Sequence, residues 1–112
     1  MNRGDIYYFA LDPTVGSEIR KTRPCVIVSN DKNNVVREMV TVVPLTSNLT
    51  RVRKIEVIIL KANSGLTKDS KALIPQMRAI SCERVIGTRA GRVAPDVMGR
   101  IDDALKLHLS LD

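Results

Sequence analysis

The chain has 112 residues, of which 44% are hydrophobic and 27% charged, and its 18 lysines and arginines outnumber 12 acidic residues to give a formal charge of +6. This length accommodates one domain with one modest core, and the ordinary apolar content excludes a disordered chain. The positive charge favours a polyanionic partner, such as nucleic acid or an acidic protein segment; the alternative is a generic basic protein without such a partner.

Cysteine and histidine content restricts the chemistry. The chain has two cysteines, Cys25 and Cys82, no C-x-x-C pair and one histidine, His108. This content predicts reduced, buried thiols rather than a disulfide scaffold, and neither a zinc or iron site nor a cofactor is expected. The N-terminus has no apolar leader and no apolar run reaches membrane-spanning length, so we expect a soluble cytoplasmic protein with no membrane partner.

A long polar loop separates the first two predicted strands. Residues 6–11 are apolar and rich in aromatic side chains and end at Asp12-Pro13, which predicts a strand followed by a turn. A second extended segment starts at Arg23-Pro24 and continues to Val28. A small domain that devotes so much of its length to one charged loop is expected to use it. The charged residues of this loop region are Glu18, Arg20, Lys21 and Arg23.

Two further strands flank a basic turn. Residues 39–45 predict a third strand, in which Pro44 marks an edge, a bulge or the strand end. The turn formers of 46–48 follow, and a basic hairpin tip over 50–54 leads into a fourth strand over 55–60. Residues 63–65 then turn the chain.

The last part of the chain predicts more extended structure and one helix. Residues 72–80 are mostly extended despite Pro75, and 84–93 holds a strand interrupted by Gly87. Residues 95–111 predict a helix, because proline suits the first helical position and apolar residues recur at helical spacing. The shared face of this helix contains Val97, Ile101, Leu105 and His108. Together the elements predict one mainly β domain over 1–112 with a C-terminal helix, as a small antiparallel barrel or curled sheet.

Three blocks of the sequence, in this order, resemble one known family. They are RGDIYYFALDPTVGSEIRKTRPCVIVSND, VVPLTSN and ALIPQMRAISCERV, the last followed by the helix. Each block alone is a weak signal, but their ordered combination covers nearly the whole chain. The sequence is therefore similar to the MazF/PemK (Kid-like) toxins of bacterial type II toxin–antitoxin systems.

The resemblance implies a homodimer with an SH3-like, PemK/CcdB-like barrel that cuts single-stranded RNA at short sequences without a metal. It also implies a cognate antitoxin that covers the RNA site. The family pattern places the catalytic arginine at Arg23 and the catalytic threonine at Thr46, and Glu18 corresponds to an active-site acid of some members. Pro75 is a departure, because some members carry a carboxylate with a catalytic role there, so the general base cannot be transferred from that position.

The three residues suit the chemistry that the resemblance implies. Metal-free RNA cleavage removes a proton from the 2′-hydroxyl, stabilises the phosphorane oxygens and stabilises the leaving 5′-oxygen, which leaves a 2′,3′-cyclic phosphate and a 5′-hydroxyl. The guanidinium fork of Arg23 can bind two phosphate oxygens, and the Thr46 hydroxyl can donate to the same phosphate. Glu18 is the candidate base, provided that its loop closes over the substrate.

Further polar residues are candidates for RNA binding. The basic tip can follow an RNA backbone, although such a run is most often a solvated surface, and Gln76 can read a base edge. Arg78 is assigned a structural role, pairing with an acid in the sheet. The RNA-binding candidates are Arg20, Lys21, Ser47, Asn48, Arg51, Arg53 and Gln76.

Two other functions remain as alternatives. A CcdB-like toxin would share the fold and inhibit a topoisomerase by contact, but such proteins lack the paired arginine and threonine. A catalytically silent member would only bind its antitoxin or DNA, and Pro75 keeps this possibility open. The single His108 excludes a ribonuclease mechanism that uses two histidines.

Overall fold

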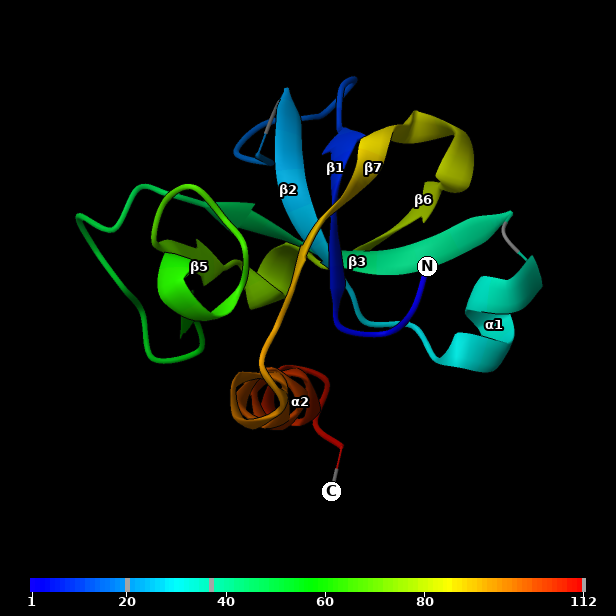
Figure 1. Ribbon diagram of the computed structural model, residues 1–112. Coiled ribbons are helices and arrows are strands. Elements are labelled where there is room, and N and C mark those ends of the chain that lie inside the picture. The colour runs from blue at the N-terminus through cyan, green and yellow to red at the C-terminus, as the bar shows by residue number, and fades with distance from the viewer. Residues whose placement is uncertain (20, 37, 112) are drawn as a thin grey trace.

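The fold was taken from a computed structural model that describes residues 1–19, 21–36 and 38–111. The chain is mainly β, with short helices between some of the strands and a longer helix at its C-terminal end (Figure 1). The strands are β1 Asp5–Ala10, β2 Thr22–Ile27, β3 Met39–Thr46, β4 Val57–Ile59, β5 Ser70–Ala72, β6 Arg78–Ser81 and β7 Val85–Arg92. The α-helices are α1 Asp31–Val36 and α2 Pro95–His108, and the short 3-10 helices are η1 Lys61–Asn63, η2 Ile74–Gln76 and η3 Cys82–Arg84.

The sheet is antiparallel and strongly curled. Its strand order is β4-β5-β3-β2-β1-β7, and β6 pairs with the first half of β3. The long strand β3 therefore belongs to both ends of the sheet, pairing with β6 through 39–42 and with β5 through 45–46. Within the described residues, β7 pairs only with β1 and β6 only with β3, so the sheet stays open where a closed barrel would join its edges.

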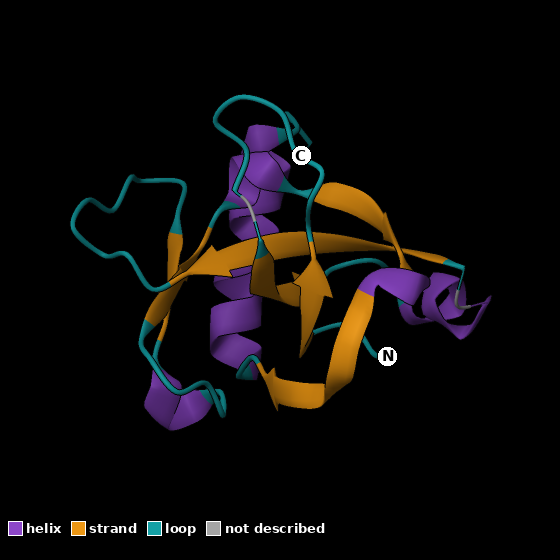
Figure 2. Ribbon diagram, turned by 90° about the horizontal axis from the view of Figure 1, so that it is seen from above, coloured by secondary structure: helices purple, strands orange, loops and turns teal. Residues whose placement is uncertain are grey.

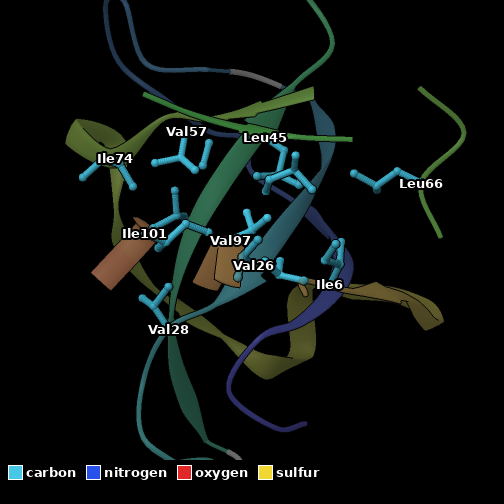
Figure 3. Packing of buried hydrophobic residues seen from close by; sticks show 13 residues of the cluster. Ile6, Val26, Val28, Leu45, Val57, Leu66, Ile74, Val97 and Ile101 are labelled. Atoms are coloured by element: carbon cyan, nitrogen blue, oxygen red, sulfur yellow. The ribbon is translucent and has the colours of Figure 1, made fainter. Parts of the chain in front are cut away.

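Two apolar clusters fill the two faces of this sheet. The larger cluster includes Ile6, Val26 and Leu45 from the strands, and helix α2 covers it with Val97 and Ile101 (Figure 3). The smaller cluster lies on the other face and is built from 7–11, Cys25, Ile27, β6 and the first half of β3. Seen from above, α2 crosses below the long strand (Figure 2). Alternating side chains of the same strands supply both clusters, as a two-residue period requires.

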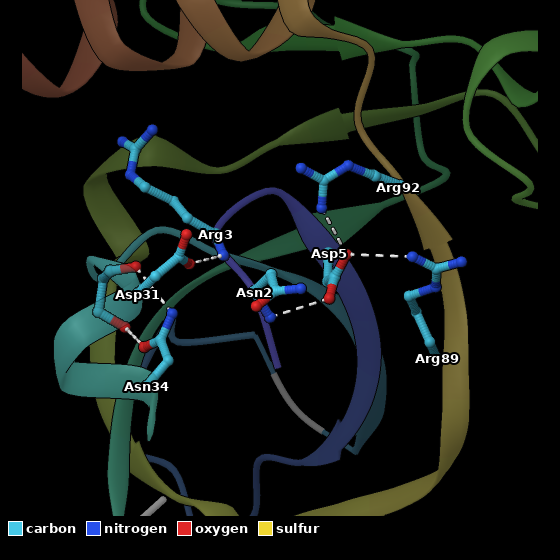
Figure 4. Close-up of polar contacts among 8 residues, drawn as sticks. Asn2, Arg3, Asp5, Asp31, Asn34, Arg89 and Arg92 are labelled. Carbon is cyan, nitrogen blue, oxygen red and sulfur yellow. Dashed lines mark hydrogen bonds and ion pairs between the residues drawn. The ribbon is translucent and has the colours of Figure 1, made fainter. Parts of the chain in front are cut away.

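The N-terminal Arg3-Gly4-Asp5 segment fastens β1 to distant elements (Figure 4). The Arg3 guanidinium pairs with Asp102 of α2 and donates to the Val28 carbonyl at 2.9 Å. Gly4 takes a φ of 93°, a conformation that favours glycine, and its N–H donates to the Ile27 carbonyl at 2.8 Å. The buried carboxylate of Asp5 accepts from Arg92 at 2.7 Å, and from Arg89 and the Asn2 N–H.

Replacing Asp5 with asparagine should lower the free energy of unfolding by about 1–3 kcal/mol at pH 7, because the substitution removes hydrogen bonds between charged partners. Burial raises the pKa of Asp5, but hydrogen bonds from Asn2 and Arg92 and the Arg92 charge outweigh it, so the pKa lies below its ordinary value. The stabilisation by Asp5 is therefore present above the pKa that Asp5 has in the unfolded chain. It is lost as pH falls through the lower pKa that Asp5 has in the folded protein.

Urea unfolding of wild type and Asp5→Asn at pH 7 and pH 3 tests this prediction, with the exposed Asp103→Asn as the matched control. The difference in unfolding free energy should narrow at pH 3. An Asp5→Asn variant as stable as Asp103→Asn at pH 7 would show that the cluster does not stabilise the fold.

The structure corrects several local predictions. Helix α2 ends at His108, which is exposed, rather than at 111. The segment 72–80 is broken by η2 between two strands, and α1 was not predicted at all. Arg78 has the structural role predicted for it, but its guanidinium donates to the Leu11 carbonyl at 3.2 Å instead of pairing with an acid. Both cysteines are free thiols, and Cys25 is buried as predicted, whereas Cys82 is only partly buried.

Candidate active site

A groove of about 540 Å³ lies between the β1–β2 loop and the connection 47–56 that joins β3 to β4. Ser17 and Ile19 line it from the loop, and Thr46, Lys71 and Gln76 line it from the sheet and η2. The exposed arginines of the connection, Arg51 and Arg53, form part of its rim. Hydroxyl, amide and cationic groups thus converge on a space large enough for part of a polyanionic strand.

Thr46 is the last residue of β3 and is half-buried at the groove. Its Oγ1 accepts a hydrogen bond from the Asn48 N–H at 3.2 Å, which fixes the turn that follows the strand. Because the oxygen is the acceptor in this bond, the hydroxyl proton is not used by it and can be donated to a ligand oxygen. Ser47 and Asn48, the turn residues predicted to bind RNA, follow Thr46 directly and are both exposed.

Arg23 is half-buried in β2 and lines a second cavity of about 220 Å³. Ser47 and Lys68 line the same cavity. Arg23 and Thr46 therefore line different cavities, although Ser47, which follows Thr46 directly, lines the same cavity as Arg23. The antiparallel pairing of β2 with β3, in which Cys25 faces Pro44, brings the strand ends that carry both residues to the same edge.

Glu18 is exposed and folded back on its own loop. Its carboxylate accepts from the Val15 N–H at 2.5 Å, while its own N–H donates to the Val15 carbonyl at 3.2 Å. Its neighbours Ser17 and Ile19 line the groove, but Glu18 is not among the described residues that do so. A role as general base therefore requires this loop to rearrange and close over the substrate.

The side chain of Gln76 anchors this loop to the sheet. Its Oε1 accepts from the Ile19 N–H at 2.6 Å, and this contact leaves both amide N–H groups available to read a base. Lys21 closes the loop at its other end with a φ of 68°, its carbonyl accepting from the Leu11 N–H at 3.0 Å and its side chain exposed. Arg20 lies outside the residues that the structure describes.

Sequence reasoning missed a buried ion pair at the floor of the groove. The Lys71 ammonium lies 2.9 Å from a carboxylate oxygen of Glu56, with side chains only 11% and 8% exposed. Burial raises the pKa of Glu56, but hydrogen bonds from the Arg53 N–H and Lys71 outweigh it, so its pKa lies below the ordinary value. The sequence shows only a lysine between the small residues Ser70 and Ala72, and the structure reveals that all three are buried in a short strand.

Other reactive groups fit a catalytic role poorly. Burial raises the pKa of the Cys25 thiol to about 12, although the charge of Arg78 opposes this, so Cys25 is not a thiolate nucleophile at neutral pH. Over 1–19, 21–36 and 38–111, no three His, Cys, Asp or Glu side chains gather as metal ligands would. In the same part of the chain, no helix has the length and apolar character needed to span a membrane.

Comparisons with known proteins extend these observations. The family model for the PemK-like, MazF-like toxin of type II toxin–antitoxin systems matches residues 2–109. Endoribonuclease MazF9 of Mycobacterium tuberculosis is 42% identical over 116 residues, covering 99% of this chain and 98% of the relative.

Two solved structures share the fold. MazF (Form-I) from Deinococcus radiodurans matches with a TM-score of 0.85 at 19% identity, covering 99% of this chain and 97% of that chain. An endoribonuclease in complex with its cognate antitoxin, from a mycobacterial species, matches with a TM-score of 0.81 at 24% identity, covering 100% of this chain and 97% of that chain. Both confirm the predicted class, a mainly antiparallel sheet with a C-terminal helix.

Proposed function

Because this chain belongs to the PemK-like, MazF-like family of type II toxin–antitoxin toxins, we propose that it is a sequence-specific endoribonuclease toxin (an mRNA interferase) neutralised by a cognate antitoxin. The observation that carries the proposal is the groove, which is lined by Thr46 together with the exposed Arg51 and Arg53. The whole of 1–112 acts as one toxin domain, and its RNA substrate places it in the cytoplasm.

The proposed reaction needs no metal. The 2′-oxygen attacks the adjacent phosphorus, the bond from phosphorus to the 5′-oxygen breaks, and the products carry a 2′,3′-cyclic phosphate and a 5′-hydroxyl. Arg23 stabilises the charge that develops on the phosphate oxygens, and Thr46 donates its hydroxyl proton to the same group. Glu18 takes the proton of the 2′-hydroxyl once its loop has released Val15 and closed over the strand, and the departing 5′-oxygen takes up a proton from water.

Incubating the purified protein with a mixed-sequence single-stranded RNA in EDTA, followed by mapping of the ends, tests the function. We expect cleavage at a short recurring sequence. Intact RNA together with inhibition of a topoisomerase would favour the CcdB-like alternative, and intact RNA with antitoxin binding alone would favour a silent member, as the exposed Pro75 in the groove allows.

The antitoxin should compete with RNA for the groove. The charge of +6 and the arginines at the rim favour an acidic, partly disordered segment that folds as it binds. Titrating such a peptide against labelled, uncleavable RNA should displace the RNA, and the peptide's affinity should fall as salt rises. Simultaneous binding with undiminished RNA affinity would show that inhibition does not act by covering the site.

The protein should form a homodimer in which the end of α2 and the residues after it take part. Leu107 and Leu111 are 73% and 60% exposed, and Leu111 lines a groove of mixed polarity together with Val28, Met77 and Leu105. Burying such a surface stabilises a small domain. Light scattering at micromolar concentration should give twice the chain mass, and Leu111→Asp should shift it toward the monomer. A wild-type monomer under these conditions would contradict the assignment.

A further inference from the structure

The connection 47–56 is held to the sheet at two places. At its start, the Asn48 N–H donates to Thr46 Oγ1, and Asn48 Oδ1 accepts from the Thr50 N–H at 3.1 Å. At its end, the Lys71 ammonium donates to the Arg51 carbonyl and to Glu56. The loop extends well away from the body of the sheet (green, at the left of Figure 1), so these hydrogen bonds decide where its arginines lie.

The second anchor holds the backbone of the loop in one position. Glu56 Oε1 accepts one hydrogen bond from the Lys71 ammonium and another from the Arg53 N–H, the latter at 2.8 Å. The Glu56 N–H donates a third to the Arg53 carbonyl at 3.0 Å. One buried carboxylate and one buried ammonium thus fix the backbone of both arginines, while the arginine side chains stay exposed.

The strand register places this anchor beside the catalytic candidate. Lys71 of β5 faces Thr46 of β3 on one side and Ile58 of β4 on the other. Side chains directly opposite in an antiparallel pair project from the same face, about 4.5–5.5 Å apart at Cβ. The same residue that opposes Thr46 therefore also holds the loop that carries Arg51 and Arg53.

We propose that Lys71 and Glu56 are positioning residues that fix the 51–56 turn so that Arg51 and Arg53 bind the phosphates of an RNA strand passing over Thr46. The proposal rests on the proposed function for its substrate, and assigns the pair a part in binding RNA rather than in bond cleavage. A buried ion pair is weak evidence for stability, because desolvation offsets its attraction. The free-energy cost of burying these two charges is understandable where the ion pair fixes a loop geometry that RNA binding requires.

The ionisation of Glu56 agrees with this role. The lowered pKa of Glu56 keeps its carboxylate charged throughout the neutral range. The contribution of this carboxylate to the stability of the fold is present above the ordinary pKa of a glutamate. It is lost as pH falls through the lowered pKa of Glu56 in the folded protein. The anchor should therefore hold at every pH at which RNA cleavage is measured near neutrality.

The test uses Lys71→Met, with Lys61→Met as the matched control because Lys61 is an exposed lysine outside the groove. The probe is a mixed-sequence single-stranded RNA with 2′-O-methyl groups, which cannot be cleaved. Lys71→Met should weaken binding several-fold, and the slope of log affinity against log salt should become shallower by about 0.7 for every phosphate that is no longer neutralised. Cleavable RNA should show a raised KM with kcat little changed.

A double-mutant cycle separates positioning from a general disruption of structure. In the Arg51→Ala/Arg53→Ala background, Lys71→Met should weaken binding no further, because the guanidinium groups that it positions are already absent. Equal weakening in both backgrounds, or an effect no larger than that of Lys61→Met, would overturn the proposal. If wild type leaves RNA uncut while the cycle still shows this coupling, the cleavage function fails and the positioning role stands.

Two further variants cover the case in which Lys71→Met does not fold. Lys71→Arg retains a charged donor and should recover most of the binding, whereas Glu56→Gln keeps the acceptor oxygen and loses only the charge. Hydrogen exchange of amides 50–56 should be faster in Glu56→Gln than in wild type, with exchange in β1 and α2 unchanged. Unchanged exchange over 50–56 in the folded variant would overturn the proposal.

Discussion

Replacing Arg23 with alanine should slow RNA cleavage about 10²–10³-fold, the usual cost of removing one electrostatic contact to a transition state. Arg23 is half-buried in β2 and lines a cavity together with Ser47, the residue that follows Thr46, so its side chain lies near the end of β3. Single-turnover cleavage of RNA, compared with wild type, measures the effect. Arg23→Lys should recover little, because an ammonium cannot reproduce the two-pronged geometry that binds two phosphate oxygens.

Arg100→Ala is the matched control for removal of one arginine. Arg100 is exposed on α2, and its contact with Asp96 spans 3.8 Å at the surface, so this change should leave cleavage unaffected. Arg23→Ala should also unfold at nearly the wild-type temperature. Near-wild-type cleavage by folded Arg23→Ala would exclude Arg23 from transition-state stabilisation.

A strand with deoxyribose at the scissile nucleotide should resist cleavage altogether, since the proposed nucleophile is the 2′-oxygen of that nucleotide. A strand with deoxyribose one nucleotide away controls for altered binding and should still be cut. Products of the normal substrate should carry a 2′,3′-cyclic phosphate and a 5′-hydroxyl, and EDTA should not stop the reaction. Cleavage of the deoxy-substituted strand at the usual rate, or inhibition by EDTA, would refute the mechanism.

The main elements could be predicted because local patterns dominate them. Apolar runs bounded by turn residues mark the strands, and Pro95 with apolar residues at helical spacing marks the start of α2. Helix α1 could not be predicted in this way. It has only six residues, too few for a periodic signal, and its contacts include local hydrogen bonds of the buried Asn34 with Ser29 and a long-range one from the Arg3 N–H to Asp31.

The candidate site, too, could be predicted only in part. The order of the motifs located Arg23 and Thr46, and the structure places both at one edge of the sheet. The hydrogen-bond or ion-pair partner of each polar side chain could not be predicted from the sequence, because it depends on how segments distant in the chain pack together. Thus Gln76 binds the loop backbone at Ile19, 57 residues away along the chain, and Lys71 meets Glu56 across the region where β5 pairs with β4.

The Arg3–Asp102 and Asp5–Arg92 pairs have a consequence for how the toxin matures during synthesis. They join the first strand to elements about ninety residues or more further along the chain, with separations of 99 and 87. Contacts of such high order form late and slow folding. Strand β1 therefore lacks its pairing with β7 and its link to α2 until both have left the ribosome, so a nascent chain that ends before α2 remains an incomplete toxin.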